Sequence, residues 1–125
     1  MAGRLQDKVT VVTGAGNGIG RATALRFAEE GSAVIVADIQ IDKADETVQL
    51  IQDNGGNAKS ISVDVTSGAD NDAMAELAVS QFGGLDCLVT AAGISHANYV
   101  SGDIEPDIKS IVENRATYLE RPGWE

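Results

Sequence analysis

The chain has 125 residues, enough for one domain, and an apolar fraction of 43% that is ordinary for a globular protein. Acidic residues outnumber basic ones by 19 to 9, and the net charge of −10 argues against nucleic-acid or anionic-membrane partners, which need a basic face. The chain has no run of about 18 apolar residues, no signal-like start and only one cysteine, so we expect a cytoplasmic protein without a membrane span or disulfide framework.

Short apolar runs alternate with amphipathic stretches along the whole sequence. The runs are typical of buried strands, and the amphipathic stretches have the apolar spacing of helices and end at glycine or asparagine. In chain order we expect strands and helices at 9–12, 18–30, 33–37, 41–53, 59–63, 67–82 and 85–89, then a polar loop over 91–103 and a last helix between 104 and 119.

This alternation predicts a Rossmann-type doubly wound α/β fold with a parallel sheet and right-handed crossovers. We expect the strand order 3-2-1-4, a domain over residues 1–119 and an irregular tail over 120–125. A complete sheet of this kind has about six strands, so we expect the domain to be truncated after the fourth. Strand 85–89 would then be an open apolar edge, which favours a homo-oligomer or association with another chain.

A glycine-rich segment, Thr-Gly-Ala-Gly-Asn-Gly-Ile-Gly, connects the first expected strand to the first helix. It does not fit G-x-G-x-x-G, but it fits T-G-x-x-x-G-x-G with Gly14, Gly18 and Gly20. These glycines allow a tight turn, close approach of a pyrophosphate and close packing of the helix on the sheet, respectively. The helix N-terminus adds free N–H groups and partial positive charge. The segment therefore predicts a dinucleotide site rather than an ordinary flexible loop.

Asp38 ends the second expected strand. In a dinucleotide-binding fold, an acidic side chain there accepts hydrogen bonds from the adenosine ribose. It also repels a 2′-phosphate, by roughly 4 kcal/mol for unit charges about 4 Å apart at an effective dielectric near 20. No basic residue at positions 15, 17 or 39 offsets that repulsion. We therefore expect NAD to be preferred over NADP; the alternative is a solvated aspartate at a strand end.

Together these segments resemble the short-chain dehydrogenase/reductase family. The likeness begins at Gly3-Arg4-Leu5 and extends to about Leu119, with the glycine turn as its most specific part. The resemblance implies hydride transfer between NAD and an alcohol or carbonyl carbon. It also implies these cofactor contacts: Gly14, Asn17, Gly18, Ile19 and Gly20 around the pyrophosphate, Asp38 on the adenosine ribose, Asp64 and Val65 beside adenine, and Ala92 and Gly93 along the adjacent ribose.

The sequence departs from the family where the chemistry is performed. The family uses a serine on a fifth strand and a Tyr-x-x-x-Lys pair, in which the tyrosine transfers the proton and the lysine lowers the tyrosine pKa. Four residues after Tyr99 and Tyr118 stand Asp103 and Pro122, so neither tyrosine forms that pair.

Two asparagine positions of the family also differ. Thr90 and Ala91 stand where the fourth-strand motif has two asparagines. The fourth-helix asparagine of the family matches Glu113 in one alignment and Asn114 in another, so Asn114 is the single catalytic candidate.

These observations predict the N-terminal part of an NAD-dependent dehydrogenase, not catalytic by itself. Two alternatives are a non-catalytic NAD-binding module and an interaction module that pairs through the edge at 85–89. The remaining reactive residues, Cys87, Ser95 and His96, show neither a nucleophile arrangement nor metal-ligand spacing, so we expect no metal site. His96 is either a solvated loop residue or a substrate contact.

Overall fold

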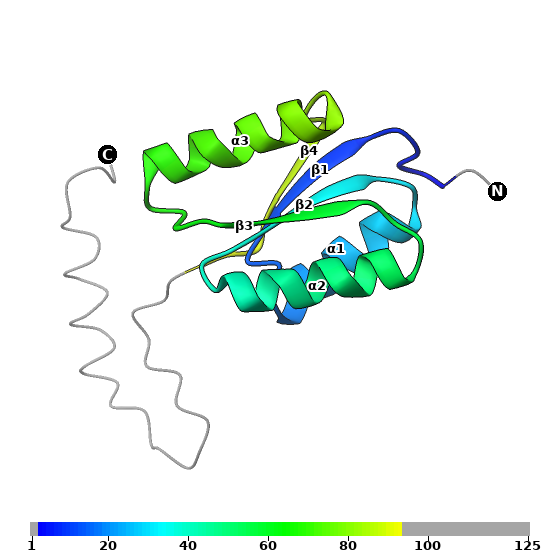
Figure 1. Cartoon of the computed structure of the whole chain (residues 1–125), viewed down its shortest axis with the longest axis horizontal. Helices are drawn as coiled ribbons and strands as arrows, with labels where there is room; N and C mark the ends of the chain where they lie inside the picture. Colours follow the sequence, from blue (N-terminus) through cyan, green and yellow to red (C-terminus); the bar gives the residue numbers. More distant parts are fainter. Residues whose placement is uncertain (1–2, 94–125) are drawn as a thin grey trace, which may run out of the picture. The chain divides into compact units, whose positions relative to one another are not determined.

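The computed structural model describes residues 3–93, in which four strands alternate with three helices (Figure 1). The expected helix between 104 and 119, the tail and Asn114 lie outside the described residues. The elements are β1 (Val9–Thr13), α1 (Gly18–Glu29), β2 (Ala33–Asp38), α2 (Ile41–Asp53), β3 (Ala58–Ser62), α3 (Gly68–Phe82) and β4 (Cys87–Thr90).

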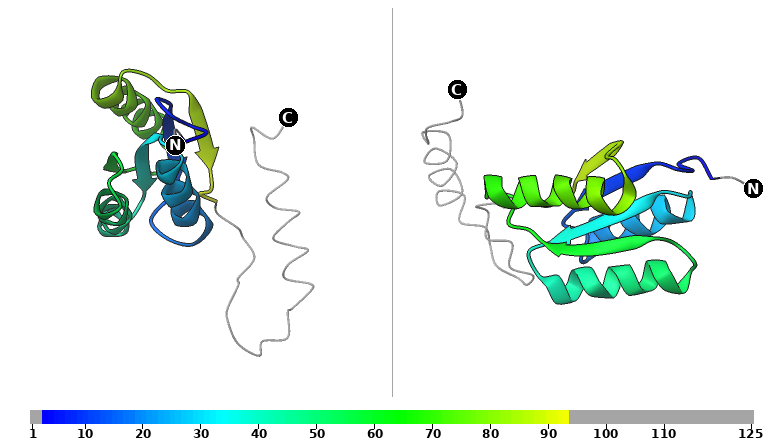
Figure 2. Two further views of the ribbon diagram at one scale, coloured as in Figure 1. Left: turned by 90° about the vertical axis from the view of Figure 1, so that its right-hand side faces the viewer. Right: turned by 45° about the horizontal axis from the view of Figure 1, so that its top comes forward.

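The strands form one parallel sheet in the order β3-β2-β1-β4, which confirms the predicted order. β1 is central because it pairs with β2 on one side and with β4 on the other. All five residues of β1 are buried, as a parallel strand covered on both faces should be. Figure 2 shows β4, in yellow, at one side of the sheet.

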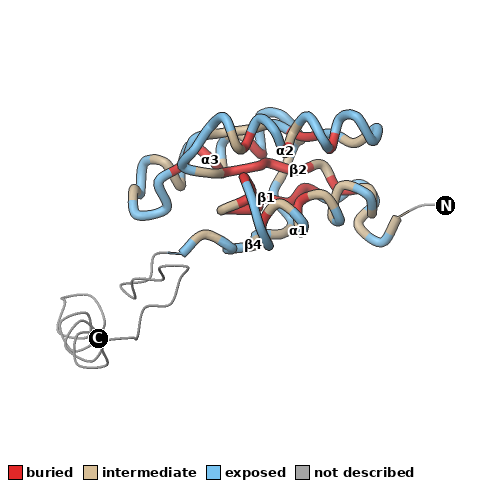
Figure 3. The backbone as a smooth tube through the Cα atoms, turned by 90° about the horizontal axis from the view of Figure 1, so that it is seen from below, coloured by how far each residue is buried: buried red, intermediate tan, exposed pale blue. Residues whose placement is uncertain are grey.

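The two faces of the sheet carry separate cores. Helices α1 and α2 cover one face and α3 covers the other (Figure 1). Val12 and Val36 point to the first face, whereas Val11 and Ile35 point to the second, as the period of two along a strand requires. Figure 3 shows the buried strands β1 and β2 between these layers, with β4 only partly covered.

β4 is the least covered strand. Val89 packs against the core beneath α1 and α2, but its neighbour Leu88, on the opposite face beside Val11, is 56% exposed. Leu85, just before the strand, is 42% exposed. Among residues 3–93, β4 has β1 as its single strand partner. The edge is therefore open and apolar within the part of the chain that the structure describes.

The predicted start of this strand at Leu85 was two residues too early. Asp86 explains the difference, because its carboxylate accepts a hydrogen bond from the N–H of Val9 at 2.8 Å. The backbone N–H of Asp86 donates to the carbonyl of Val9 at 2.9 Å. A side chain thus replaces one rung of the ladder, and regular pairing begins at Cys87 opposite Thr10.

Candidate functional site

The carboxyl ends of all four strands meet at one edge of the sheet. The register places Thr13 beside Ala37 and Thr90, and Asp38 beside Ser62. The segments that follow these strand ends therefore lie next to one another. Together with Asp38, the last residue of β2, they contain every predicted cofactor residue from Gly14 to Gly93. In open α/β sheets, ligands bind outside this edge, where the strand order reverses.

The glycine-rich turn has a shape that side chains would disturb. Gly14 has a φ of +65°, and a Cβ there would lie 2.7 Å from the backbone nitrogen of Ala92. A Cβ at Gly20 would overlap the carbonyl oxygen of Gly14. Gly14 therefore allows the turn to pack against the end of β4, and Gly20 allows the first turn of α1 to lie against the turn itself.

The first half of the turn is tied to its neighbours by hydrogen bonds. The N–H of Ala15 donates to the carbonyl of Ala37 at 3.0 Å, and the N–H of Gly16 donates to the Asp38 carboxylate at 2.9 Å. On the opposite side, the Thr47 hydroxyl donates to the carbonyl of Ala15 at 2.7 Å. Ala15 and Gly16 are buried as a result.

The second half of the turn is open. Asn17, Gly18 and Ile19 are exposed, and Ile19 is 82% exposed. Asn17 is the N-cap of α1, yet it makes no side-chain capping bond, and the first turn contains no acidic residue. The first backbone bond of the helix joins the N–H of Arg21 to the carbonyl of Asn17 at 3.1 Å. Within residues 3–93, nothing accepts from the N–H groups at positions 18–20, which leaves them for an anion.

Helix α3 shows what a self-capped helix looks like in the same fold. The Ser67 side chain accepts a hydrogen bond from the N–H of Asp70 at 3.2 Å, and Asp70 places a negative charge in the first turn. The serine thus provides an acceptor for a free N–H group at the start of α3, and the aspartate offsets the helix dipole, so both needs are met within the chain. Because α1 lacks both, the chemistry of its N-terminus fits a phosphate group.

Asp38 is half-buried beside the turn. One carboxylate oxygen accepts the N–H of Gly16 and the other accepts the N–H of Gln40, both at 2.9 Å. A carboxylate has about four acceptor positions, so each oxygen can accept one more hydrogen bond. The side chain is therefore fixed in place while it retains the capacity to bind a diol such as a ribose.

Asp64 organises the loop that follows β3. Its carboxylate accepts hydrogen bonds from the Thr66 hydroxyl at 2.6 Å and from the Thr66 N–H at 2.9 Å. These bonds, the hydroxyl first, lower the pKa of Asp64, so the group is charged at neutral pH. Because the pKa is lowered, these bonds stabilise the loop at pH values above the ordinary pKa of an aspartate. This contribution is lost as the pH falls through the lowered pKa.

The end of β4 is joined to β1 without the asparagines that the family has there. The N–H of Ala91 donates to the carbonyl of Thr13 at 3.2 Å, and the N–H of Ala92 donates to the Thr13 hydroxyl at 3.4 Å. Two backbone N–H groups, together with the carbonyl and the side-chain hydroxyl of Thr13, thus make the connection in this chain. Ala92 is half-buried and Gly93 is exposed at the same edge.

The structure adds residues that the sequence did not identify. Gly16 lies against Asp38, and a Cβ there would lie 2.7 Å from the Asp38 carboxylate. Ile39, immediately after Asp38, is 66% exposed. It could have been identified from the sequence as an apolar residue that directly follows the acidic one. Thr47 had no such signal, because a threonine in the middle of a helix is ordinary.

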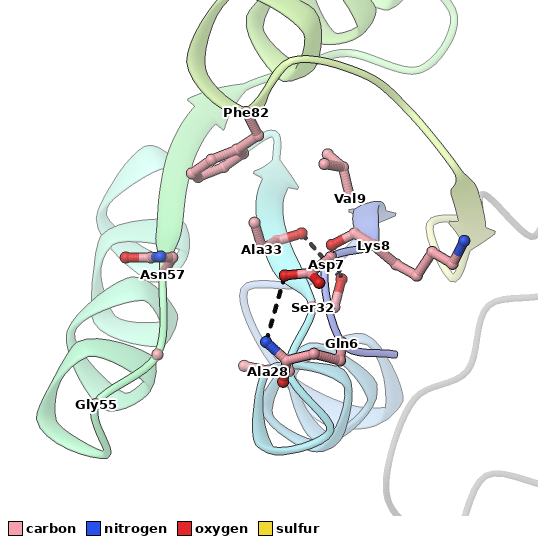
Figure 4. Close-up of a pocket in the computed structure, with 12 residues that line it drawn as sticks. Gln6, Asp7, Lys8, Val9, Ala28, Ser32, Ala33, Gly55, Asn57 and Phe82 are labelled. Atoms are coloured by element: carbon pink, nitrogen blue, oxygen red, sulfur yellow. Dashed lines mark hydrogen bonds between the residues drawn. The ribbon is translucent and has the colours of Figure 1, made fainter. Parts of the chain in front are cut away.

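A hollow lies at the opposite end of the strands from the candidate site. It has a volume of about 470 Å³ and is bordered by Gln6, Lys8, Asn57 and Phe82 (Figure 4). The Ser32 hydroxyl on its wall is already bonded to Thr10 and to backbone carbonyls. Among the described residues, no buried side-chain nitrogen or oxygen lacks a hydrogen-bond partner, so no buried group points to a ligand there.

The described residues contain no group of three side chains suited to a metal ion. No helix within residues 3–93 is long and apolar enough to cross a membrane.

Comparison with known proteins connects this geometry to a family. The sequence model described as short chain dehydrogenase matches residues 8–115. The 7α-hydroxysteroid dehydrogenase of Escherichia coli (strain K12) is 43% identical over 90 residues, which are 72% of this chain and 35% of that protein. The chain thus spans about a third of the length of this curated relative.

Two solved structures show the same arrangement of elements. A short chain dehydrogenase from Mycobacterium avium matches with a TM-score of 0.73 and 36% identity, over 88% of this chain and 43% of the other. A 7α-hydroxysteroid dehydrogenase in complex with NADH and 7-oxo glycochenodeoxycholic acid matches with a TM-score of 0.67 and 42% identity, over 68% and 33% of the two chains.

Proposed function

Because the chain belongs to the short-chain dehydrogenase family, we propose that its residues form the NAD-binding part of an oxidoreductase that transfers hydride between NAD(H) and an alcohol or carbonyl carbon. The observation that carries this proposal is the uncapped N-terminus of α1, which follows a buried, anchored glycine turn and lies beside a fixed aspartate. The relative with bound NADH supports the same assignment.

The cofactor contacts follow the edge of the sheet in order. The pyrophosphate would lie against the open N–H groups of α1, with Asp38 on the adenosine ribose and the apolar side chains of Ile39 and Val65 beside adenine. Ala92 and Gly93 would line the adjacent ribose. When bound, the nicotinamide would accept or donate the hydride. The full set of proposed residues is Gly14, Asn17, Gly18, Ile19, Gly20, Asp38, Ile39, Asp64, Val65, Ala92 and Gly93.

We propose that residues 1–125 bind the dinucleotide without turning over a substrate. The family transfers the proton through its Tyr-x-x-x-Lys pair, and the sequence contains no such pair. Asn114 would assist a proton relay only in the presence of that pair.

Calorimetric titration with NADH and, in parallel, NADPH tests the proposal. We expect saturable NADH binding and at least about tenfold weaker NADPH binding, because the 2′-phosphate would lie beside the Asp38 carboxylate. Asp38→Asn should reduce the ratio of the NADPH dissociation constant to the NADH dissociation constant, because it removes the charge beside the 2′-phosphate. Asp53→Asn, which neutralises an exposed aspartate at the far end of α2, is the matched control and should leave the ratio unchanged. Absence of NADH binding to the wild-type chain would refute the proposal.

A second candidate function is association through the edge of β4. It is favoured by the exposed apolar side chains of Leu85 and Leu88 on a strand with one described neighbour. The partner would be a second copy or another chain that extends the sheet. Sedimentation velocity over a range of chain concentrations distinguishes a self-associating chain from a monomeric one.

A further inference from the structure

Thr47 joins the middle of α2 to the glycine turn. Its side chain is completely buried, and its hydroxyl donates to the carbonyl of Ala15 at 2.7 Å. A threonine inside a helix can bond the carbonyl three or four residues earlier. Here that contact, to the carbonyl of Lys43, is longer at 3.3 Å. The shorter bond therefore leaves the helix and reaches the turn.

Arg21, in the first two turns of α1, orients this hydroxyl. Its Nε donates to the Thr47 oxygen at 2.9 Å, and one terminal nitrogen donates to Glu46 at 2.9 Å and to the carbonyl of Lys43 at 3.2 Å. A guanidinium donates only and a hydroxyl has one proton. The Thr47 oxygen must therefore accept from Arg21, and its proton is directed to Ala15.

The guanidinium is itself held by charge. The hydrogen bond from Arg21, followed by the positive charge of Lys43, lowers the pKa of Glu46. The Glu46 carboxylate is therefore ionised at neutral pH. It forms an ion pair with Arg21 at 2.9 Å and a longer one with Lys43 at 3.6 Å.

The bond from Thr47 completes the anchoring of the turn. The N–H of Ala15 is held by β2 and its carbonyl by α2, while the N–H of Gly16 is held by Asp38. Two successive peptide groups are thus fixed immediately before the exposed residues 17–19. Fixed donors bind a charged ligand more strongly than mobile ones, because less ordering is required when the ligand arrives.

We propose that Thr47 is a positioning residue for the dinucleotide, oriented by Arg21, which holds the turn so that the open N–H groups of α1 face the pyrophosphate. This inference rests on the proposed NAD-binding function. Thr47 does not contact the ligand, and its effect passes through the carbonyl of Ala15.

The test compares NADH binding to the full 125-residue chain and to three variants. Thr47→Val removes the hydroxyl at nearly constant volume and should weaken NADH binding about five- to tenfold. Thr47→Ser retains the hydroxyl and should bind within about twofold of wild type. Thr10→Val is the matched control, because Thr10 is equally buried and lies in β1, where its hydroxyl bonds that of Ser32, the residue before β2, at 2.8 Å and away from the turn. It should lower the thermal midpoint as Thr47→Val does, but leave NADH affinity unchanged.

A fourth variant, Arg21→Lys, covers the case in which Thr47→Val does not fold. It retains the positive charge that pairs with Glu46 but lacks the Nε donor to Thr47, so we expect about threefold weaker binding. If Arg21→Lys or Thr47→Val bound NADH with wild-type affinity, the inference would be overturned and the proposed function would stand. An equal loss of NADH affinity in Thr10→Val would have the same consequence. No NADH binding by the wild-type chain would overturn the proposed function together with it.

Discussion

At the scale of single residues, Gly20 shows how closely the turn and the helix pack. Gly20→Ala would force its methyl group into the carbonyl oxygen of Gly14, and we expect a loss of about 1–3 kcal/mol in the free energy of unfolding, measured by urea denaturation.

Gly68→Ala is the matched control for this substitution. Gly68 is the first residue of α3, and a Cβ there would meet nothing within 4 Å. Because alanine favours a helix more than glycine does, we expect Gly68→Ala to be neutral or slightly stabilising. An equal loss of stability in both variants would mean that the contact with Gly14 is not the cause.

The role of Asp38 was predictable from the sequence only in part. Its position at the end of an apolar run indicated an acidic group at the carboxyl edge of the sheet. Its bonds to Gly16 and Gln40 depend on the path of the chain after β1 and β2, which no local pattern specifies. For the same reason the bond between Thr47 and Ala15, 32 positions apart, could not be predicted.

At the scale of elements, the Ser67 cap stabilises α3 in a way that has no counterpart in α1. Ser67→Ala removes the acceptor for the N–H of Asp70, so we expect the free energy of unfolding to fall by about 1 kcal/mol. Ser80→Ala in the same helix is the control, because this exposed hydroxyl bonds only the carbonyl of Leu77 within the helix. Its effect should be within about 0.5 kcal/mol of zero.

The helices were predictable because their starts and stops are local signals. The expected helix over 41–53 coincides with α2, and those expected over 18–30 and 67–82 differ from α1 and α3 by one residue. Asparagine and glycine mark these ends. Strand starts are set by pairing with distant residues instead. β3 accordingly begins at Ala58, opposite Val34, one residue before the expected position.

At the scale of the whole described part, residues 3–93, α3 packs against β1 and β2 and leaves Leu88 of β4 exposed. If the chain associates through this edge, Leu88→Lys should shift sedimentation towards the monomer, because a lysine on an edge strand opposes pairing.

Leu50→Lys provides the comparison for that experiment. Leu50 is 40% exposed on α2 and lies away from β4 in the fold. It should leave the sedimentation of the chain unchanged. Equal behaviour of the two variants and the wild-type chain would exclude the β4 edge as the contact.

Of the four described strands, β1 leaves the ribosome first, yet it gains its second neighbour only after β4 has been made. β1 can pair with β2 early. The partners of its other edge, Asp86 and β4, are synthesised later, since Asp86 lies 77 positions after Val9. At about 5–20 residues per second, that interval lasts roughly 4–15 s. Throughout it, the strand that ends up most deeply enclosed is an edge strand, so the centre of the finished sheet is open to mispairing while the chain is being made.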